Sequence, residues 1–476
     1  MYFLLKRHFL LRGWERAPYA VVDTRSGKAR FVNKATFEAF ELCNGRIDCD
    51  LPLIPEVLRR GVRRLAEEGF VDALPKASSI APDQEYRLCP SRYIRQAHWS
   101  VTGRCNYRCK HCYMSAPHAK FGELDHETTM GIVDQLAECG VGSVSLTGGE
   151  PLVRSDFLDI VDALLGHGIH ITQIYSNGRL VNERLLAALE KRGICPEFNM
   201  SYDAPGWHDW LRGVDGAEAD VDRAFLLCRE HGFPTGAETC LHEHNKHLLR
   251  ETVNHLASVG CANLKVNPVG DVGEWKARGY GQSLSLDELF DLYLAYIPQY
   301  YEDGMPLRIQ LGGLFAASPK KPDRYAVPLD RGSCDPARTC VCSHARQVLY
   351  ISAEGRTLPC MSVSGMDIQQ EFPLIPKVGL ATCLSDSRYM RFIDTRASEY
   401  LDLHPECKAC EFCGRCLGGC RASALEFNGQ TDLMGRDEAA CKIFRGGYAA
   451  RVHEIMEAIL TAKEKSWPHL TAANSC

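Results

Sequence analysis

The chain has 476 residues, which is enough for two to four domains of ordinary size. Hydrophobic residues make up 45% of it and charged residues 24%, the proportions of a water-soluble globular protein. The formal net charge of −5 does not favour binding to nucleic acid or to an anionic membrane. No apolar run reaches the length of a membrane span and no signal peptide is recognisable, so we expect a cytoplasmic protein.

Residues 1–80 begin with two strand-like stretches, the second of which contains a turn at 26–27. Apolar residues at helical spacing follow over 34–45 and 51–70. Two or three strands with three short helices predict a small winged-helix-like module. The polar stretch 75–85 is then expected to be a linker.

From about 96 to 302 the chain alternates between strand patterns and amphipathic helical patterns. This order predicts an α/β fold with parallel strands joined by right-handed crossovers. The pattern leaves open whether the strands form a barrel or a flat doubly wound sheet, but in both cases ligands gather at the carboxyl ends of the strands. The strand candidates are 98–103, 143–148, 171–177, 197–201, 235–240 and 263–268.

The region from about 330 to 448 has little periodicity and many glycine, proline and cysteine residues. We expect it to bury little apolar surface for its length, so its own cysteines are the expected stabilising groups. Residues 449–476 are predicted to form an amphipathic helix and a tail.

Cysteine is the unusual residue type, with 23 in the chain and most of those in the last third at short spacings. In a reducing cytoplasm, such cysteines are metal ligands more often than disulfides. Others stand singly in apolar segments and are expected to be small core residues. These are Cys139, Cys195, Cys228, Cys240 and Cys261.

Three cysteines, Cys105, Cys109 and Cys112, follow the first strand candidate. A closed structural metal site normally has four ligands, so three thiols indicate a metal centre with one position left for another molecule. A four-iron cluster held by three thiolates has this property. Zinc is the alternative, with His111 and His118 nearby, but no residue completes the set at zinc-like spacing.

This loop resembles the CxxxCxxC motif of the radical S-adenosylmethionine (SAM) enzymes, where it follows the first strand of a partial (β/α)6 barrel similar to a TIM barrel. TGGEP, which contains Gly148, Gly149 and Glu150, resembles the turn that holds the methionine amino group in this family. Glycines let the backbone approach a ligand, and a carboxylate pairs with an ammonium group. YSNGR at 175–179 looks like the family's turn after the third strand.

MSYDAPGWHDWLRG at 200–213 resembles the family's fourth-strand motif. The resemblance implies that Ser201 contacts the ribose or methionine portion of SAM and that Arg212 contacts its carboxylate. The chain departs from the motif at Ala204, where the family has glycine, and the spacing from Ser201 to Arg212 is one residue shorter. Pairing of Arg212 with Asp209, or capping of a helix, is the alternative. His111, inside the cysteine motif, is also included among the expected SAM-binding residues.

The resemblance also implies a reaction. A reduced cluster cleaves bound SAM, and the resulting 5′-deoxyadenosyl radical removes a hydrogen atom from the substrate. Such an enzyme needs an external one-electron reductant such as flavodoxin or ferredoxin. No catalytic residue is assigned from the sequence. Asp335, beside Cys334, is equally a candidate base and a solvated turn residue.

The C-terminal cysteines resemble those of the SPASM domain, an extension of radical SAM enzymes that carries two auxiliary four-iron clusters. Residues 303–448 would then hold a bridging region and this domain, for a total of three [4Fe–4S] clusters. Carried over by position, the ligands of the first auxiliary cluster are Cys342, Cys360 and Cys420, and those of the second are Cys407, Cys410, Cys416 and Cys441. The fourth ligand of the first is Cys334, Cys340 or none, and Cys413 is surplus. A zinc ribbon is the alternative, but it would not explain the hairpin pattern that ends at Cys360.

The first 80 residues resemble the peptide-recognition element (the pyrroloquinoline quinone chaperone type) of enzymes that modify ribosomally made peptides. In that family a leader peptide adds as an extra strand; the alternative is a packing domain without a ligand. Together the three parts imply a maturase of a precursor peptide, with thioether crosslinking first, then carbon–carbon or carbon–oxygen crosslinking, then epimerisation. A sulfatase-maturase-like oxidase of cysteine or serine, and a redox scaffold that does not cleave SAM, are the competing interpretations.

Overall fold

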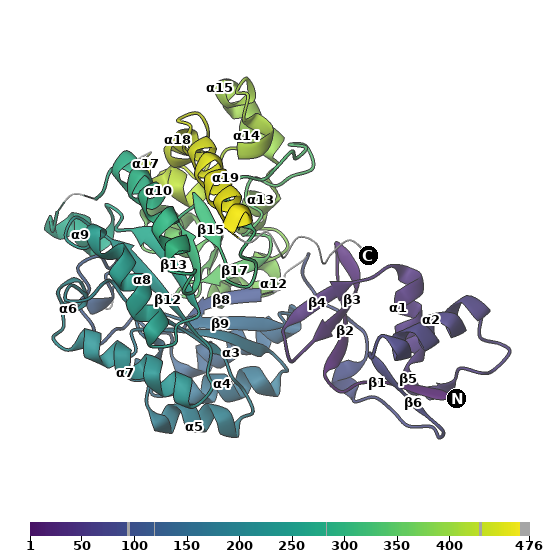
Figure 1. The fold of residues 1–476 in the computed structure, drawn as a ribbon. Helices are drawn as coiled ribbons and strands as arrows, with labels where there is room; N and C mark the ends of the chain where they lie inside the picture. The colour runs from purple at the N-terminus through teal and green to yellow at the C-terminus, as the bar shows by residue number, and fades with distance from the viewer. Residues whose placement is uncertain (93–95, 119, 282, 428–430, 467–476) are drawn as a thin grey trace.

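The computed structural model describes residues 1–92, 96–118, 120–281, 283–427 and 431–466. The predicted tail beyond residue 466 lies outside these residues. An N-terminal module projects from one side of a central barrel, and the C-terminal third covers another side (Figure 1). Within the described residues, no helix is long and apolar enough to cross a membrane.

The N-terminal module contains two small sheets and two helices among its described residues. One sheet joins β1 (Tyr2–Leu5) to β5 (Asn44–Asp48) and β6 (Val71–Leu74); the other has the order β4 (Lys28–Phe31), β3 (Ala17–Asp23), β2 (Phe9–Trp14), β7 (Arg87–Leu88). The helices are α1 (Lys34–Leu42) and α2 (Glu56–Glu67). Gly45, the last residue of the helical pattern 34–45, lies in β5 with a φ of 79°. A Cβ there would lie 2.8 Å from Leu4 Cδ1, so the chain enters a strand directly after α1.

The stretch predicted to be a linker is packed against the module. Gln84 is buried, and its Nε2 donates to the carbonyls of Leu5, Lys6 and Phe9. β7 follows at once and pairs with β2. The end of the predicted linker is therefore fixed to the module, because one amide side chain satisfies three backbone acceptors that are distant in sequence.

The module contacts the barrel at the amino ends of its strands. Trp14 Nε1 donates to the Cys139 carbonyl at 2.7 Å, just before the strand that starts at Ser143. Arg16 pairs with Asp394 of the C-terminal third at 2.6 Å. The module is therefore held at the end of the barrel opposite to the carboxyl ends of the strands. Ligands are expected at those carboxyl ends, away from the module.

The central sheet follows the chain order, strand beside strand. Its parallel strands in the described residues are β8 (Gln96–Ser100), β9 (Ser143–Thr147), β10 (His170–Ser176), β11 (Glu197–Ser201), β12 (Thr235–Leu241), β13 (Asn263–Pro268) and β14 (Arg308–Leu311). This order confirms a partial barrel, because in a doubly wound sheet the order in which successive strands are added reverses partway along the chain. The six predicted strands are present, the first displaced toward the N-terminus.

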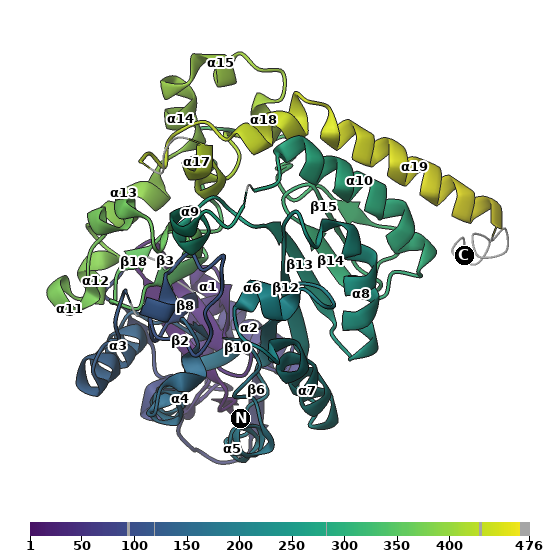
Figure 2. The same ribbon diagram turned by 90° about the vertical axis from the view of Figure 1, so that its left-hand side faces the viewer.

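Helices cover the outer face of this sheet and leave its inner face open (Figure 2). They are α3 (His126–Glu138), α4 (Phe157–Gly166), α5 (Glu183–Lys191), α7 (Ala217–Glu230), α8 (Leu249–Ser258) and α10 (Leu286–Glu302). Their apolar faces and the outward strand residues form one large core, which includes Val144, Ile174 and Phe198. Cys139, Cys228 and Cys261 are buried as predicted, but Cys195 is exposed and Cys240 is only partly buried.

The C-terminal third begins with a short strand pair. β17 (Val348–Ile351) extends the central sheet beside β8, and β18 (Thr357–Leu358) completes the predicted hairpin. Short helices follow: α11 (Ile375–Val378), α12 (Leu380–Cys383), α13 (Arg388–Asp394), α14 (Ala397–Leu403), α15 (Pro405–Lys408), α16 (Cys413–Cys416), α17 (Arg421–Phe427), α18 (Glu438–Phe444) and α19 (Tyr448–Ser466).

The expectation that this whole region buries little apolar surface was wrong for residues 341–401. Leu349, Tyr350, Leu380 and Tyr389 belong to the same large core as the barrel. The reason is that β17 joins the sheet, so this segment packs as part of the barrel and not as an independent unit.

Candidate active site

A cavity of about 1010 Å³, part of it open to solvent, lies at the carboxyl ends of the strands. Its lining includes most of the residues predicted from the radical SAM motifs, namely Cys105, Cys109, His111, Cys112, Gly148, Gly149, Ser201 and Arg212. It also includes Tyr175, Glu238, Cys240 and Met361, which were not predicted as site residues. The structure therefore brings four separate motifs to one place.

The Gly-Gly turn after β9 holds the cysteine loop. The Gly149 N–H donates to the Thr102 carbonyl at 2.8 Å, and a Cβ on Gly149 would lie 2.2 Å from the Arg104 oxygen. A Cβ on Gly148 would lie 2.6 Å from the Thr102 oxygen. Only glycine permits this close approach of two backbones.

Glu150 is fully buried and does not line the cavity. Its carboxylate accepts hydrogen bonds from Ser176 Oγ, at 3.1 Å, and from the Asn177 N–H, at 2.7 Å, after β10. Burial raises the pKa of Glu150 to about 7. The side chain thus braces the turn that follows β10, and its contact with the SAM amino group stays a prediction.

Each of the three thiols faces a hydrogen-bond donor. The Tyr107 N–H lies 3.4 Å from Cys105 Sγ, the Ala116 N–H lies 3.3 Å from Cys112 Sγ, and Arg212 Nη1 lies 3.8 Å from Cys109 Sγ. Burial raises the pKa of Cys105 to about 12 and that of Cys112 to about 11. Donors aimed at buried sulfurs are typical of iron–sulfur sites, where metal binding keeps the ligands as thiolates.

The spacing of the sulfurs argues against a single zinc ion. In the part of the chain that the structure describes, one group of three metal-ligand side chains has its ligand atoms within 4.8 Å of one another: His111, Asp203 and Cys240. None of the predicted cysteine sets is that close. Zinc–sulfur bonds of about 2.3 Å in a tetrahedron bring sulfurs within about 4 Å of each other. A cluster whose ligands bind different iron atoms fits the wider spacing.

Arg212, on α6 (His208–Arg212), forms a buried ion pair beneath the cysteine loop. Its Nε donates to Asp203 Oδ2 at 2.6 Å, and both side chains are buried. Burial opposes ionisation of Asp203, but the Arg212 guanidinium outweighs it and holds the pKa of this carboxyl well below its usual range. Asp209 instead accepts from the N–H groups of Gly216 and Glu218, so the pairing of Arg212 with Asp209 was wrong.

Ala204 adopts a φ of 117° and is buried. Residues with a Cβ rarely adopt this conformation, whereas glycine does so readily. The strained backbone explains physically why the related motif has glycine at this position.

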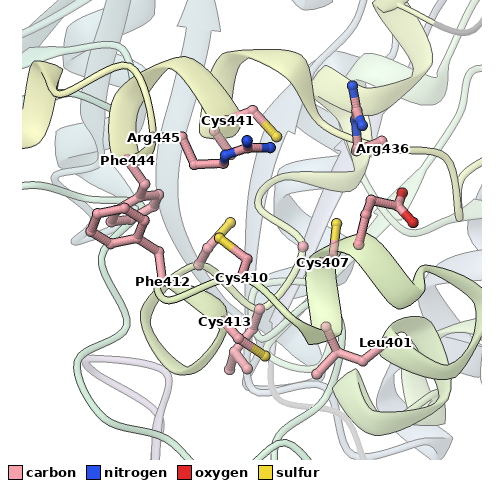
Figure 3. Close-up of a pocket in the computed structure, with 14 residues that line it drawn as sticks. Leu401, Cys407, Cys410, Phe412, Cys413, Arg436, Cys441, Phe444 and Arg445 are labelled. Carbon is pink, nitrogen blue, oxygen red and sulfur yellow. The ribbon is translucent and has the colours of Figure 1, made fainter.

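Five of the C-terminal cysteines line a second cavity: Cys407, Cys410, Cys413, Cys416 and Cys441. All of them except Cys413 are the ligands predicted for the second auxiliary cluster. In the view of Figure 3, the sulfur of Cys413 points away from those of Cys407, Cys410 and Cys441. The arrangement fits a four-thiolate cluster with Cys413 outside the ligand set.

Cys342, Cys360 and Cys420 form a third group. Burial and the neighbouring Cys360 thiol raise the pKa of Cys420 to about 12, and Cys360 acts in the same direction on Cys342. Met361, next to Cys360, lines the active-site cavity, so this third group adjoins it.

The two candidates for a fourth ligand have other partners. Cys340 Sγ lies 2.7 Å from Arg346 Nη1 and 3.4 Å from Arg396 Nη1. Cys334 Sγ donates to the Arg331 carbonyl at 3.0 Å. Asp335 is exposed and accepts from the Ala337 N–H, which is the geometry of a solvated turn residue.

Glu238 and Cys240 could have been found from the sequence. Both lie at alternate positions of the strand candidate 235–240, and alternate residues of a strand share one face. The missing information was which face points inward, and that depends on the pairing with the neighbouring strands.

Residues 99–256 match the sequence model of the Radical SAM superfamily. With the fold and the thiol loop, this match identifies residues 99–256 as a radical SAM domain, a class of domain that holds a [4Fe–4S] cluster and SAM. Among its relatives is the PqqA peptide cyclase of Granulibacter bethesdensis, 25% identical over 367 residues that cover 76% of this chain and 89% of the relative. The AdoMet-dependent heme synthase of Oleidesulfovibrio alaskensis is 25% identical over 354 residues, which cover 70% and 83% of the two chains.

Two solved structures share the fold. Streptococcus suis SuiB bound to precursor peptide SuiA has a TM-score of 0.61 at 13% identity and covers 92% of this chain and 100% of its own. Native anSMEcpe with bound AdoMet and Cp18Cys peptide has a TM-score of 0.58 at 18% identity, covering 78% of this chain and 99% of its own. These likenesses show that the fold of the two structures extends over most of this chain.

Proposed function

We propose that this enzyme matures a ribosomally made precursor peptide by forming a crosslink in it, most specifically a thioether. The observation that supports the proposal is that Met361, the residue after the proposed ligand Cys360, lines the same cavity as the cysteine loop. The names of relatives and neighbours support a peptide substrate, since they include a peptide cyclase and a complex with a precursor peptide.

The N-terminal module is proposed to bind the leader of this peptide. β4 is an edge strand in the described four-stranded sheet, so it offers unpaired backbone groups to an added strand. The module also carries seven of the ten large apolar side chains that are exposed in the described residues: Met1, Phe31, Leu51, Leu53, Val57, Tyr86 and Leu88. A surface of this kind is typical of a binding module.

A thioether requires a substrate thiol to be held near the substrate radical. Three ligands for an auxiliary cluster come from Cys342, Cys360 and Cys420. The Cys334 thiol donates a hydrogen bond to the Arg331 carbonyl, and Cys340 Sγ accepts one from Arg346. This supports a cluster with an open position, which a substrate cysteine could occupy as a thiolate. The second auxiliary cluster would be held by the thiols around the cavity of Figure 3.

When bound, the SAM and its cluster supply a hydrogen-abstracting radical. The chain's own residues orient and shield it: the Gly-Gly turn offers backbone groups, Ser201 faces the same cavity, and Arg212 donates toward Cys109. A flavodoxin-like or ferredoxin-like reductant is the proposed electron source.

The test is anaerobic co-expression with short reading frames encoded beside the gene, followed by mass measurement of each peptide. We expect the peptide to lose two hydrogens per crosslink and to have one fewer thiol open to alkylation. With Cys105→Ala, the mass of the peptide should not change. A loss of two hydrogens without a fall in the number of alkylated thiols would indicate a carbon–carbon or carbon–oxygen link. A peptide that loses no hydrogens but takes up deuterium from solvent would indicate epimerisation.

Two comparisons separate the competing functions. The same peptide without its leader should be a poor substrate; equal turnover would favour a sulfatase-maturase-like oxidase that acts on a core sequence alone. Wild-type protein that forms no 5′-deoxyadenosine with SAM and a strong reductant would contradict enzymatic function and favour a redox scaffold.

A further inference from the structure

The inner face of the barrel is polar, unlike that of a complete barrel, which branched apolar side chains fill. Its inward residues in the described strands include His98, Ser145, Gln173, Asn199, Ser201, Glu238, Lys265 and Gln310. Such a surface remains hydrated or receives a polar ligand, since a buried polar group without a partner costs free energy.

Four of these residues form a row. Strand pairing places Ser201 beside Glu238, Glu238 beside Lys265, and Lys265 beside Gln310. In-register residues of parallel strands point to the same face, so the row runs from the expected SAM contact at Ser201 across the second half of the barrel. Lys265 Nζ lies 3.8 Å from a Glu238 carboxylate oxygen.

Glu238 is the single carboxylate in the cavity lining among the residues that the structure describes. The other charged residue there, Arg212, is already paired with the buried Asp203. Glu238 is part-exposed and has one cation, Lys265, at ion-pair distance. It is therefore accessible from the cavity.

Crosslinking requires such a group. Two hydrogens leave the peptide: one leaves as an atom from a C–H bond, and the other leaves as a proton from the partner X–H, where X is sulfur or oxygen. We infer that Glu238 accepts this proton from X–H. The X–H bond breaks, both of its electrons stay on X, and the carboxylate becomes a carboxylic acid that later releases the proton to solvent. The carbon radical and X⁻ then form the C–X bond, and the one surplus electron would pass to an oxidised auxiliary iron–sulfur cluster, the acceptor that the proposed function supplies. Lys265 is a positioning residue that holds the carboxylate toward the cavity. This inference rests on the proposed function.

The experiment compares Glu238→Gln with wild type in the reconstituted holoenzyme, using a peptide deuterated at the reacting carbon. We expect deuterium transfer into 5′-deoxyadenosine to stay within about two-fold of wild type, while crosslinked product falls by about 100-fold, the usual scale for loss of a general base.

Glu197→Gln is the matched control. Glu197 lies on the same inner face of β11, four residues before Ser201 and so about 13 Å from the level of Glu238, and it contacts Asn263. It should crosslink as wild type does. Iron content and thermal stability check that both variants are intact.

Three results would overturn the inference. Glu238→Gln could crosslink at the wild-type rate, or it could lose SAM binding and 5′-deoxyadenosine together, which would assign Glu238 to the cosubstrate. Wild type could also make only an epimerised peptide, which needs no proton acceptor. Failure of the proposed function has a different signature, because wild type would then release no deuterated 5′-deoxyadenosine with any leader-bearing peptide.

Discussion

The barrel and the segment 402–441 are stabilised in different ways. The barrel packs the apolar faces of its helices against outward strand residues in one continuous core. In the described part of 402–441, the buried apolar side chains are Leu417, Ala424, Leu425, Leu433 and Ala440, and the segment contains six cysteines. In the proposed function, the sulfurs of these cysteines would bind metal where a core would otherwise be.

The difference also separates two kinds of cysteine loop. In the barrel, the loop of Cys105, Cys109 and Cys112 is held by backbone hydrogen bonds, such as those from Arg108 and Lys110 to carbonyls of α6. In 402–441 the proposed ligands would themselves join distant parts of the segment. Metal should therefore be needed for chemistry in the barrel loop and for folding in the C-terminal segment.

Removal of one ligand in each loop tests this comparison and has the largest expected effect. Cys410→Ala should unfold 402–441, because loss of a structural metal site removes on the order of 10 kcal/mol of binding free energy. Anaerobic limited proteolysis with mass spectrometry should show cleavage there while the barrel stays protected, and iron should fall from about twelve to about eight atoms per chain.

Two matched variants sharpen this result. Cys105→Ala should also lose about four iron atoms but leave 402–441 protected. Cys413→Ala, whose sulfur points away from the other ligands, should keep its iron. Equal protease sensitivity of Cys105→Ala and Cys410→Ala would contradict the comparison.

The barrel is not stabilised by apolar packing alone, since Arg212 and Asp203 form a buried pair in it. Arg212→Met removes the guanidinium from the buried Asp203, which keeps only the Cys240 N–H and His208 as partners, so we expect a loss of about 3 kcal/mol. Calorimetry should show a barrel transition lowered by about 10 °C. Arg192→Met, which breaks a more exposed pair with Asp162, should cost less than about 1 kcal/mol. Equal effects would mean that Asp203 is stabilised by other groups.

The parts predicted well from sequence depend on local patterns. The six strands follow from periodicity over a few residues, and Cys105, Cys109 and Cys112 follow from their spacing within one loop. These patterns need no knowledge of the partner strand, and the chain order of the motifs then places them at one end of the sheet.

The parts that could not be predicted depend on long-range contacts. Gln84 looked like part of a linker because its three carbonyl acceptors lie more than 70 residues away in the chain. Cys240 looked like a core residue because the inward face of β12 is fixed by its pairing with β11 and β13. Residues 341–401 were expected to bury little apolar surface, because their irregular pattern does not reveal that β17 joins the barrel sheet.

The buried carboxyl group of Glu150 also predicts that the stability of the protein depends on pH. The pKa of Glu150 rises from 4.5 to about 7, so the folded state binds this proton more tightly than the unfolded chain does. Its contribution to stability is complete below pH 4.5 and is lost as pH rises through about 7, an amount of about 3 kcal/mol. The thermal stability of Glu150→Gln should not decline in this way as the pH rises. An identical pH profile in both proteins would show that Glu150 titrates normally.

The smallest expected effect is the one at Ala204, where the barrel stores backbone strain beside its site. Its φ of 117° costs a residue with a Cβ about 1–3 kcal/mol. Ala204→Gly removes this cost but adds about 0.5–1 kcal/mol of unfolded-chain entropy, so we expect a net gain of about 1 kcal/mol in the free energy of unfolding. Ala237→Gly is the control: this alanine is also buried but lies in a regular strand, so the change should destabilise. If both glycines destabilise alike, the neighbours of Ala204 hold this conformation without strain, and the departure from the related motif has no energetic consequence.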